Sequence, residues 1–201
     1  MLGPTHVAVG VASALVLTHP ATIPGVMIAA AGGAAGGWIS DIDCREPKLH
    51  DVIADTVKAV VVCAAALAVD DWIGNGLCAY LRASWGTESV MGLIGFLACC
   101  LFGITTNHRS FTHSVLGIFL MIKTVSMFCQ PLAFPFGIGL VSHILLDLTN
   151  HKGIQLFWPL NKRFCLDLFD ADGMVNAIIG RVASAIAAGM ALLLLAMAVI
   201  R

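Results

Sequence analysis

Charged residues are scarce in this sequence. Asp, Glu, Lys and Arg make up only 11% of its 201 residues, whereas 59% of the residues are apolar. A soluble domain typically has about 25% charged and about 45–50% apolar residues. The few charges fall in short stretches between long uncharged runs, which leaves too little polar surface to face water. The composition therefore excludes an ordinary soluble domain and predicts a protein embedded in a lipid bilayer.

Further absences narrow the class of protein. The formal net charge is −1 and no basic stripe is present, which excludes a nucleic-acid-binding surface. None of the seven cysteines forms a CxxC pair, and several lie in apolar runs, where cysteine packs as a small hydrophobic residue. We therefore expect neither a disulfide framework nor a thiolate zinc site. The N-terminus lacks the positive charge of a cleavable signal peptide, so we expect it to be retained.

Apolar runs separated by Gly, Pro and charged residues predict helices. They cover residues 6–18, 24–39, 54–69, 88–105, 114–129, 134–149 and 174–200. The first two are shorter than the roughly 20 residues that cross the bilayer core, which predicts a re-entrant or tilted hairpin. Four glycines on the second, between residues 32 and 37, are typical of closely packed membrane helices. The sequence thus predicts an all-α polytopic bundle of about five full spans plus a short N-terminal hairpin, forming a single domain over residues 1–201.

Histidines and aspartates collect at one end of these predicted helices. If successive helices alternate in direction, all of them lie at the same face of the membrane. They are His6, Asp41, Asp43, His50, His108, His113, His143, Asp147 and His151. Such side chains are costly to bury near lipid unless they pair with one another or bind a ligand. Because the group joins segments that are far apart in the sequence, it predicts a functional site.

The spacing of these residues is suited to metal binding. His143 and Asp147 are four residues apart, so both lie on one face of a helix, although a hydrogen-bonded pair has the same spacing. A second group places two imidazoles and a guanidinium in one short loop, on His108, His113 and Arg109. Thr112 or Ser114 can cap the helix that follows this loop. Imidazole and carboxylate ligands together are typical of zinc, manganese or iron sites.

Two further carboxylates, on Asp41 and Asp43, follow the second predicted helix. One can bridge metal ions while the other binds one ion or acts as a base, although an exposed acidic turn has the same sequence. The candidate ligands outnumber the needs of one tetrahedral zinc, so we expect two or three divalent ions, zinc first and manganese as the alternative. Two ions about 3.5–4 Å apart can activate water and hold the oxygens of a transferred phosphoryl group. The predicted catalytic residues are Asp41, Asp43 and Arg109, and the predicted metal ligands are His6, Asp41, Asp43, His50, His108, His113, His143 and Asp147.

Short motifs occur in a characteristic order along nearly the whole chain. They are Thr5-His6, Ser40-Asp41-Ile42-Asp43, His108-Arg109, Thr112-His113-Ser114, and Ser142-His143 followed by Asp147. Together they resemble the YdjM-type membrane-bound metal-dependent hydrolases. The resemblance implies an inner-membrane hydrolase that is distantly similar to the zinc phospholipase C and P1 nuclease group, whose helical enzymes bind zinc through His, Asp and Glu.

The resemblance also implies roles for individual residues. His143 and Asp147 match the group's His-x-x-x-acid motif, and either Asp41 or Asp43 supplies a bridging carboxylate. The resemblance makes further ligands of His6, His108 and His113. Family members commonly carry a proline before the first aspartate, where this chain has Ser40, so we expect a looser turn here.

A metal site above apolar helices is suited to a substrate whose tail lies in the bilayer. The leading prediction is hydrolysis of a phosphoester of a lipid or lipid-linked substrate by metal-activated water, with ester or amide hydrolysis as an alternative. A metal-ion or proton transporter is the rival class, but residues 88–105 contain no ionisable side chain beyond Glu88 at the edge, so no continuous polar path is evident. Most of the Lys and Arg residues lie on the site face by helix count. This predicts a multi-pass protein of the bacterial inner membrane with a cytoplasmic site.

Overall fold

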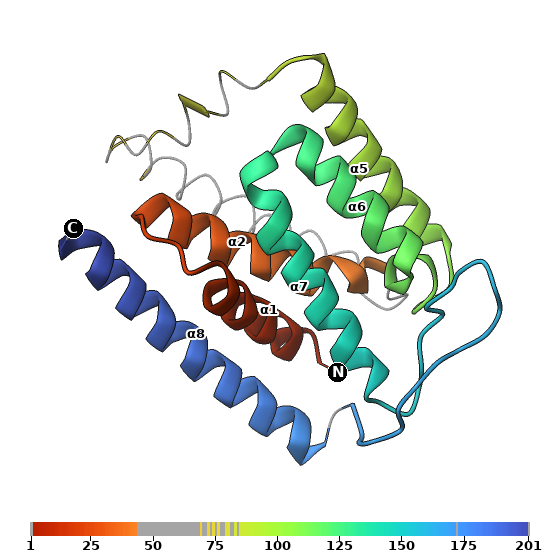
Figure 1. Cartoon of the computed structure of the whole chain (residues 1–201). Coiled ribbons are helices and arrows are strands. Elements are labelled where there is room, and N and C mark those ends of the chain that lie inside the picture. The colour runs from red at the N-terminus through yellow and green to blue at the C-terminus, as the bar shows by residue number, and fades with distance from the viewer. Residues whose placement is uncertain are drawn as a thin grey trace, which may run out of the picture.

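The computed structural model of this chain is all-helical (Figure 1). It describes residues 2–43, 85–171 and 173–200, together with isolated positions between 69 and 83. The helices are α1 (Gly3–Thr18), α2 (Ile23–Ile39), α5 (Thr87–Thr105), α6 (Val115–Phe128), α7 (Gln130–Leu148) and α8 (Met174–Ile200), with 3₁₀ turns η1 (Ser40–Asp43) and η2 (Phe111–His113). No strand occurs in these residues, only two isolated β-bridges. The predicted all-α bundle is confirmed, while most of the predicted helix 54–69 and the candidate ligand His50 lie outside the described residues.

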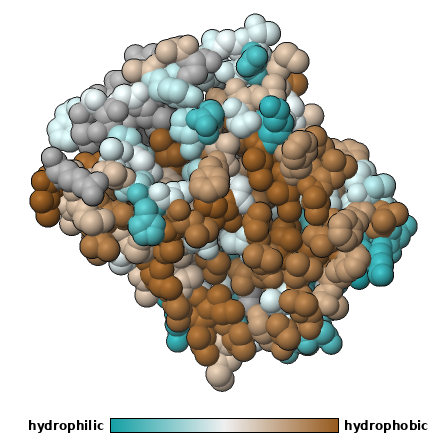
Figure 2. All heavy atoms as spheres, viewed as in Figure 1, coloured by the Kyte–Doolittle hydropathy of each residue, from teal (hydrophilic) through white to brown (hydrophobic). Residues whose placement is uncertain are grey.

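Four described segments are long and apolar enough to cross a membrane. They are Ile23–Asp43, Thr87–Thr105, Gln130–Leu148 and Met174–Ile200, and α1 and α6 are shorter apolar helices. Apolar residues cover most of the face seen in Figure 2, and hydrophilic residues gather mainly at its margins. These features are those of a polytopic helical membrane bundle. The first helix is short, as predicted for the N-terminal hairpin, but the second segment, Ile23–Asp43, is long enough to cross a membrane, contrary to the expectation that both are too short.

The helix boundaries follow from capping residues and from proline placement. Thr22 caps α2 by accepting a hydrogen bond from Gly25 N at 3.2 Å, and Ser114, one of the two predicted caps, does the same for α6 through Gly117 N at 3.0 Å. The expected start of α7 at residue 134 is wrong, because the helix begins at Gln130. Pro131 lies in the first turn of α7, where a backbone N–H would have no partner within the helix, so its absence costs nothing. Pro135 lies one turn later, inside the helix.

Glycines bring α1, α2 and α7 into backbone contact, as the small-residue strip predicts. A Cβ atom at Gly10 of α1 would lie 2.3 Å from the carbonyl oxygen of Gly33 in α2. A Cβ atom at Gly36 would lie 2.1 Å from the carbonyl oxygen of Phe136 in α7. Only glycine permits such close approach of two backbones. The resulting van der Waals contact stabilises the helix pairs, because lipid provides no hydrophobic driving force between helices. This packing places the first turn of α1, the end of α2 and the end of α7 side by side (Figure 1).

Candidate metal centre

Five ionisable side chains meet where these helix ends come together. His6 comes from the first turn of α1 and Asp41 from η1, directly after α2. His113 comes from η2, and His143 and Asp147 come from the last two turns of α7. Four of the five are fully buried, and only Asp41 retains some exposure, 20% of its side chain. The predicted convergence at one end of the bundle is therefore present in the structure.

Four of these residues point one donor atom each toward a common centre. The donor atoms of Asp41, His113, His143 and Asp147 all lie within 4.8 Å of one another. The Nε2 atoms of His113 and His143 are 3.3 Å apart, and each lies 3.4–3.9 Å from a carboxylate oxygen of Asp41 or Asp147. A tetrahedral zinc ion with bonds of about 2.0–2.1 Å separates its ligands by about 3.3 Å. The donor set and its spacing therefore fit a divalent metal ion.

The orientation of His143 favours metal binding. Its Nδ1 atom lies 2.8 Å from the carbonyl oxygen of Gly37, so Nδ1 carries the proton and Nε2 presents a lone pair to the centre. Such a hydrogen bond on the far ring nitrogen is the usual way in which proteins aim a histidine ligand. The contact depends on glycine, because a Cβ atom at Gly37 would lie 2.6 Å from the carbonyl oxygen of His6.

His113 is aimed in the same way through a hydroxyl group. The Thr112 hydroxyl donates to Asp43 Oδ2 at 2.7 Å and accepts from His113 Nδ1 at 2.9 Å, which again leaves Nε2 facing the centre. Burial lowers the pKa of His113, but hydrogen bonds to Asp147 and Asp43 outweigh it, so the pKa is raised overall. Two carboxylates thus face the ring, Asp147 Oδ2 at 3.4 Å from Nε2 and Asp43 Oδ2 at 3.5 Å from Nδ1.

Asp43 and His108 lie behind the four donors. Asp43 accepts hydrogen bonds from the Arg109 backbone N–H at 3.0 Å and from Thr112, and its other oxygen lies 2.6 Å from His108 Nδ1. His108 is 36% exposed. The structure therefore gives Asp43 the position of a residue that orients His113, while Asp41 is the carboxylate that faces the centre. Ser40 ties the same turn down by donating to the Thr112 carbonyl at 3.4 Å.

Removing this support should weaken metal binding without abolishing it. We expect Asp43→Asn to lower the metal affinity by about 10–100-fold, the usual effect of losing a partner that orients a ligand. Thr112→Val should act in the same direction, because His113 Nδ1 loses its acceptor. Competition titration with a chelating dye checks both variants. Retention of wild-type affinity would show that Asp43 does not orient His113, and complete loss would make it a ligand.

His6 stands out because its ring nitrogens have no hydrogen-bond partner although the side chain is fully buried. The ring stacks on His143 with centroids 3.7 Å apart, and its Nε2 lies 3.3 Å from Asp147 Oδ1, outside hydrogen-bonding geometry. The second oxygen of Asp147 faces His113 at 3.4 Å. Buried polar atoms rarely lack a partner, so His6 is a further candidate ligand beside the four donors.

Arg109 lies beside the centre, in contact with Asp147. Its Nη2 lies 3.2 Å from Asp147 Oδ2, its Nη1 donates to Asn150 Oδ1 at 2.7 Å, and its buried Nε has no partner. The residue adopts a left-handed backbone conformation with φ of 65°, held by hydrogen bonds from its N–H to Asp43 and from Gln155 N to its carbonyl. A fixed guanidinium group beside metal ligands is well placed to bind an anionic oxygen.

Asn150 is a further residue of the centre, and it was not among the predicted site residues. This fully buried residue donates from Nδ2 to Asp147 Oδ1 at 3.1 Å and accepts from Arg109, so it links the ligand to the guanidinium. Its spacing three residues after Asp147 was an available signal, because residues three apart lie on one helical face. His151, which follows it, points away from the centre to Asp167 and Asp170. The hydrogen bond to Asp167 raises the pKa of His151.

The comparisons with known proteins agree with this architecture. A model of the YdjM inner membrane protein family matches residues 1–201. The chain belongs to the YdjM inner membrane protein family. It is similar to the inner membrane protein YdjM of Escherichia coli (strain K12), with 34% identity over 73 residues that cover 30% of this chain and 35% of the relative. The match to this curated relative thus spans about a third of its length.

A second relative aligns over most of the chain. The uncharacterized protein YvsG of Bacillus subtilis (strain 168) is 26% identical over 175 residues, which cover 86% of this chain and 82% of the relative. No solved structure matches. The YdjM family assignment thus confirms an inner membrane protein, and the donor cluster of Asp41, His113, His143 and Asp147 shows a group that could bind metal.

Proposed function

We propose that this YdjM family protein is a membrane-bound, metal-dependent hydrolase that cleaves a phosphoester of a lipid or lipid-linked substrate. One observation carries the proposal: two imidazoles and two carboxylates converge within 4.8 Å, with the Arg109 guanidinium 3.2 Å from one of those carboxylates. A donor set of this kind matches zinc or manganese. A fixed cation at its edge matches a phosphate group.

The residues suggest more than one ion. Asp41, His113, His143 and Asp147 would hold one ion, and His6 with Asp147 would contribute ligands to a second. Asp147 is suited to bridging because its oxygens face different histidines, Oδ1 toward His6 and Oδ2 toward His113. Zinc is our first choice and manganese the second. A bound ion of this kind supplies Lewis-acid polarisation of a phosphoryl oxygen and a water nucleophile at neutral pH.

The chain's own residues would position the substrate around these ions. Arg109 can donate Nε–H, which has no partner among the described residues, to a phosphate oxygen and neutralise charge that develops during cleavage. Asn150 fixes the position of the guanidinium group, because its Oδ1 accepts a hydrogen bond from Arg109 Nη1 at 2.7 Å. Asp41, as the only partly exposed member of the four, marks the side from which water reaches the centre. The substrate's apolar part would remain in the bilayer, at the level of the apolar helices.

The distribution of ionisable side chains favours this proposal over transport. The described donor cluster lies at the ends of α1, α2 and α7, whereas the cores between α6 and α7 and between α1, α2 and α8 are apolar. An ion or proton path would place ionisable groups at intermediate depths in several helices. Ions bound at one end and hydrolysis at that end require no such path.

Lipid hydrolysis by the metal-loaded protein tests the proposal. We expect purified protein in nanodiscs, loaded with zinc or manganese, to form diacylglycerol from at least one member of a phospholipid panel that includes phosphatidic acid. Mass spectrometry of the extracted lipid measures the product. Arg109→Lys should keep its metal and lose about 100–1,000-fold in kcat/KM, because one fixed donor to the developing charge is lost. Equal turnover before and after chelation would refute a metal-dependent hydrolase.

We also propose that the centre faces the cytoplasm, and Cys165 offers a direct test. This free, exposed cysteine lies in the polar connection between α7 and α8, at the same end as the centre. In a variant that keeps only this cysteine, we expect a membrane-impermeant maleimide to label inverted vesicles at least tenfold more than intact spheroplasts. A single cysteine at Gln130, at the opposite end of α7, should show the reverse pattern. Labelling of Cys165 in spheroplasts would place the centre on the periplasmic side.

A further inference from the structure

Two cavities have lining residues at the start of α1. A polar cavity of about 380 Å³ is lined by Leu2, His108, Arg109, Asn150, Lys152 and Asp170, among others, and it borders the metal centre through Arg109, whose Nη2 lies 3.2 Å from Asp147 Oδ2. An apolar groove of about 690 Å³ runs between α1 and α8 and is lined by Pro4, Val7, Val11, Trp38, Ser184 and Ala187, with Gly3 and Ala8. Leu2 lines the cavity and the next residue, Gly3, lines the groove. Consecutive residues at the start of α1 thus line the two spaces.

The end of the groove that includes Val7 and Trp38 is near the metal centre. Gly37 packs directly on the backbone of His6, and the residues that follow each of them, Trp38 and Val7, line the groove. Asp41, the partly exposed donor, comes three residues after Trp38, about one helical turn further on. Two residues that line the groove are therefore close along the chain to His6 and Asp41.

The polar cavity is suited to an anion. Arg109, which is 95% buried, lines this cavity, and its Nε has no hydrogen-bond partner. Lys152 adds a second cation to the wall, and Asn150 holds the guanidinium in position. One acidic side chain, Asp170, also lines the cavity, and it lies 3.3 Å from His151. A buried guanidinium with an unused donor is most stable when an anionic oxygen pairs with it.

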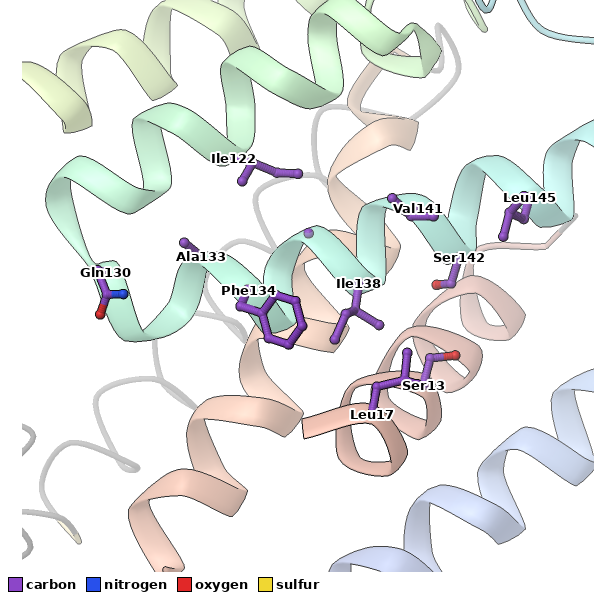
Figure 3. Close-up of a pocket in the computed structure, with 11 residues that line it drawn as sticks. Ser13, Leu17, Ile122, Gln130, Ala133, Phe134, Ile138, Val141, Ser142 and Leu145 are labelled. Carbon is purple, nitrogen blue, oxygen red and sulfur yellow. The ribbon is translucent and has the colours of Figure 1, made fainter. Parts of the chain in front are cut away.

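A second apolar groove lies along α7. It has a volume of about 570 Å³, with Leu17 of α1 and Ile122 of α6 at its sides (Figure 3). Its floor includes Val141 and Leu145, which are each two residues from His143 along α7. Two residues correspond to about 200° around a helix, so this groove lies on the face of α7 opposite the donors.

We propose that the groove between α1 and α8 holds one hydrocarbon chain of an anionic lipid whose phosphate group lies in the polar cavity. This inference rests on the proposed function, since it gives the phosphoester substrate a binding mode. The groove is lined almost wholly by apolar and small side chains, which suits a methylene chain at bilayer depth. The polar cavity provides the cationic end that an anionic headgroup requires. The class of substrate is thus a phospholipid or lipid phosphate with a negatively charged head.

Photocrosslinking in proteoliposomes tests the binding mode without requiring turnover. The probe is phosphatidic acid with a diazirine in one acyl chain, and phosphatidylcholine with the same chain measures non-specific contact with lipid. We expect phosphatidic acid to label peptides that contain Val7, Val11 or Ala187 at least fivefold more than phosphatidylcholine does. Peptides that contain Ile138 or Leu145, from the groove along α7, should show no such preference. Soluble dihexanoyl phosphatidic acid should compete with the labelling.

Filling the groove provides the matched variant. Ala187→Phe should reduce the specific labelling at least fivefold and slow diacylglycerol formation from dioleoyl more than from dihexanoyl phosphatidic acid. Ala188→Phe, the same change at an exposed neighbouring position, should behave as wild type. A single symmetric peak in gel filtration shows whether each variant is folded. If Ala187→Phe does not fold, Ala8→Phe fills the same groove from α1.

The outcomes separate the two proposals. Equal labelling by the two lipids, or preferential labelling along α7, overturns the groove assignment even if the protein hydrolyses lipid. A change in oligomeric state of Ala187→Phe with no loss of labelling also overturns it, because the groove would then pack a second copy. Specific labelling of α1 and α8 by a protein that binds no metal supports the groove and refutes the hydrolase.

Discussion

His143→Ala should abolish stoichiometric metal binding. The wild-type protein, purified in detergent without chelators and reloaded, is expected to carry at least one zinc or manganese ion per chain. His143 supplies one of four donor atoms and is held for that role by the Gly37 carbonyl. Removing a partner that only orients a ligand costs about 10–100-fold in affinity, so removing the ligand should cost more than about 100-fold. Elemental analysis per chain and competition titration measure the effect.

The control for this experiment is a residue of the same chemistry outside the centre. Asp147→Asn should lose metal as His143→Ala does, because Asp147 contributes an oxygen to the cluster and faces His6 with the other. Asp167→Asn removes a carboxylate from the exposed contact with His151 and should retain full metal content. If all three variants bind as much metal as the wild type, the donors do not form a metal site. The cluster is then a buried hydrogen-bond network.

Gly36→Ala should destabilise the bundle and also empty the metal centre. The added methyl group would lie 2.1 Å from the Phe136 carbonyl oxygen and 2.7 Å from Leu140 N, so α2 and α7 must move apart. Overpacking of this kind costs about 1–3 kcal/mol, and a clash with backbone atoms belongs at the upper end. A loss of about 3 kcal/mol lowers the midpoint of thermal unfolding by roughly 6–12 °C for a chain of this size. Because α2 and α7 carry Asp41 and His143, metal affinity should fall in the same variant.

Gly189→Ala is the matched control for this prediction. Gly189 lies in α8, and nothing is found within 4 Å of a Cβ atom added there. Alanine also favours a helix more than glycine does, by about 1 kcal/mol, so this variant should be as stable as the wild type or more stable. Unfolding in nanodiscs, followed by fluorescence-detected gel filtration after heating, compares the two variants. Equal midpoints would show that the contact between α2 and α7 does not determine stability.

The sequence predicted the helices well because apolar runs in a membrane chain are long and clearly bounded. The predicted run 174–200 coincides with α8, and the start of α7 is the main error among the described helices. The predicted helix began at residue 134, but the structure continues it back to Gln130, with Pro131 in the first turn and Pro135 one turn later. The Pro135 ring packs against Gly32, which leaves room for it because a Cβ atom on residue 32 would lie only 2.9 Å from Pro135 Cβ. That compensation comes from tertiary packing, which the local sequence does not reveal.

The candidate site was predicted as a group, but its internal order was not. Helix direction alone was enough to bring His6, His113 and His143 to one end. Helix direction could not distinguish Asp41 from Asp43, because the tight 3₁₀ turn that carries both decides which carboxylate faces the donors and which faces Thr112. The role of Asn150 depends in the same way on where α7 ends and the chain turns back.

The four donors come from three separate parts of the chain, η1 after α2, the loop before α6, and the end of α7. An ion held by all of them would act as a cross-link that exists only when the bundle is folded. The ion would raise the free energy of unfolding by an amount that increases with its concentration. At one hundred times its dissociation constant the increase is about 2.7 kcal/mol. Metal starvation would therefore do more than stop a reaction. It would loosen the join between these segments and shorten the life of the protein in a membrane that contains proteases, which makes its abundance a readout of the available metal.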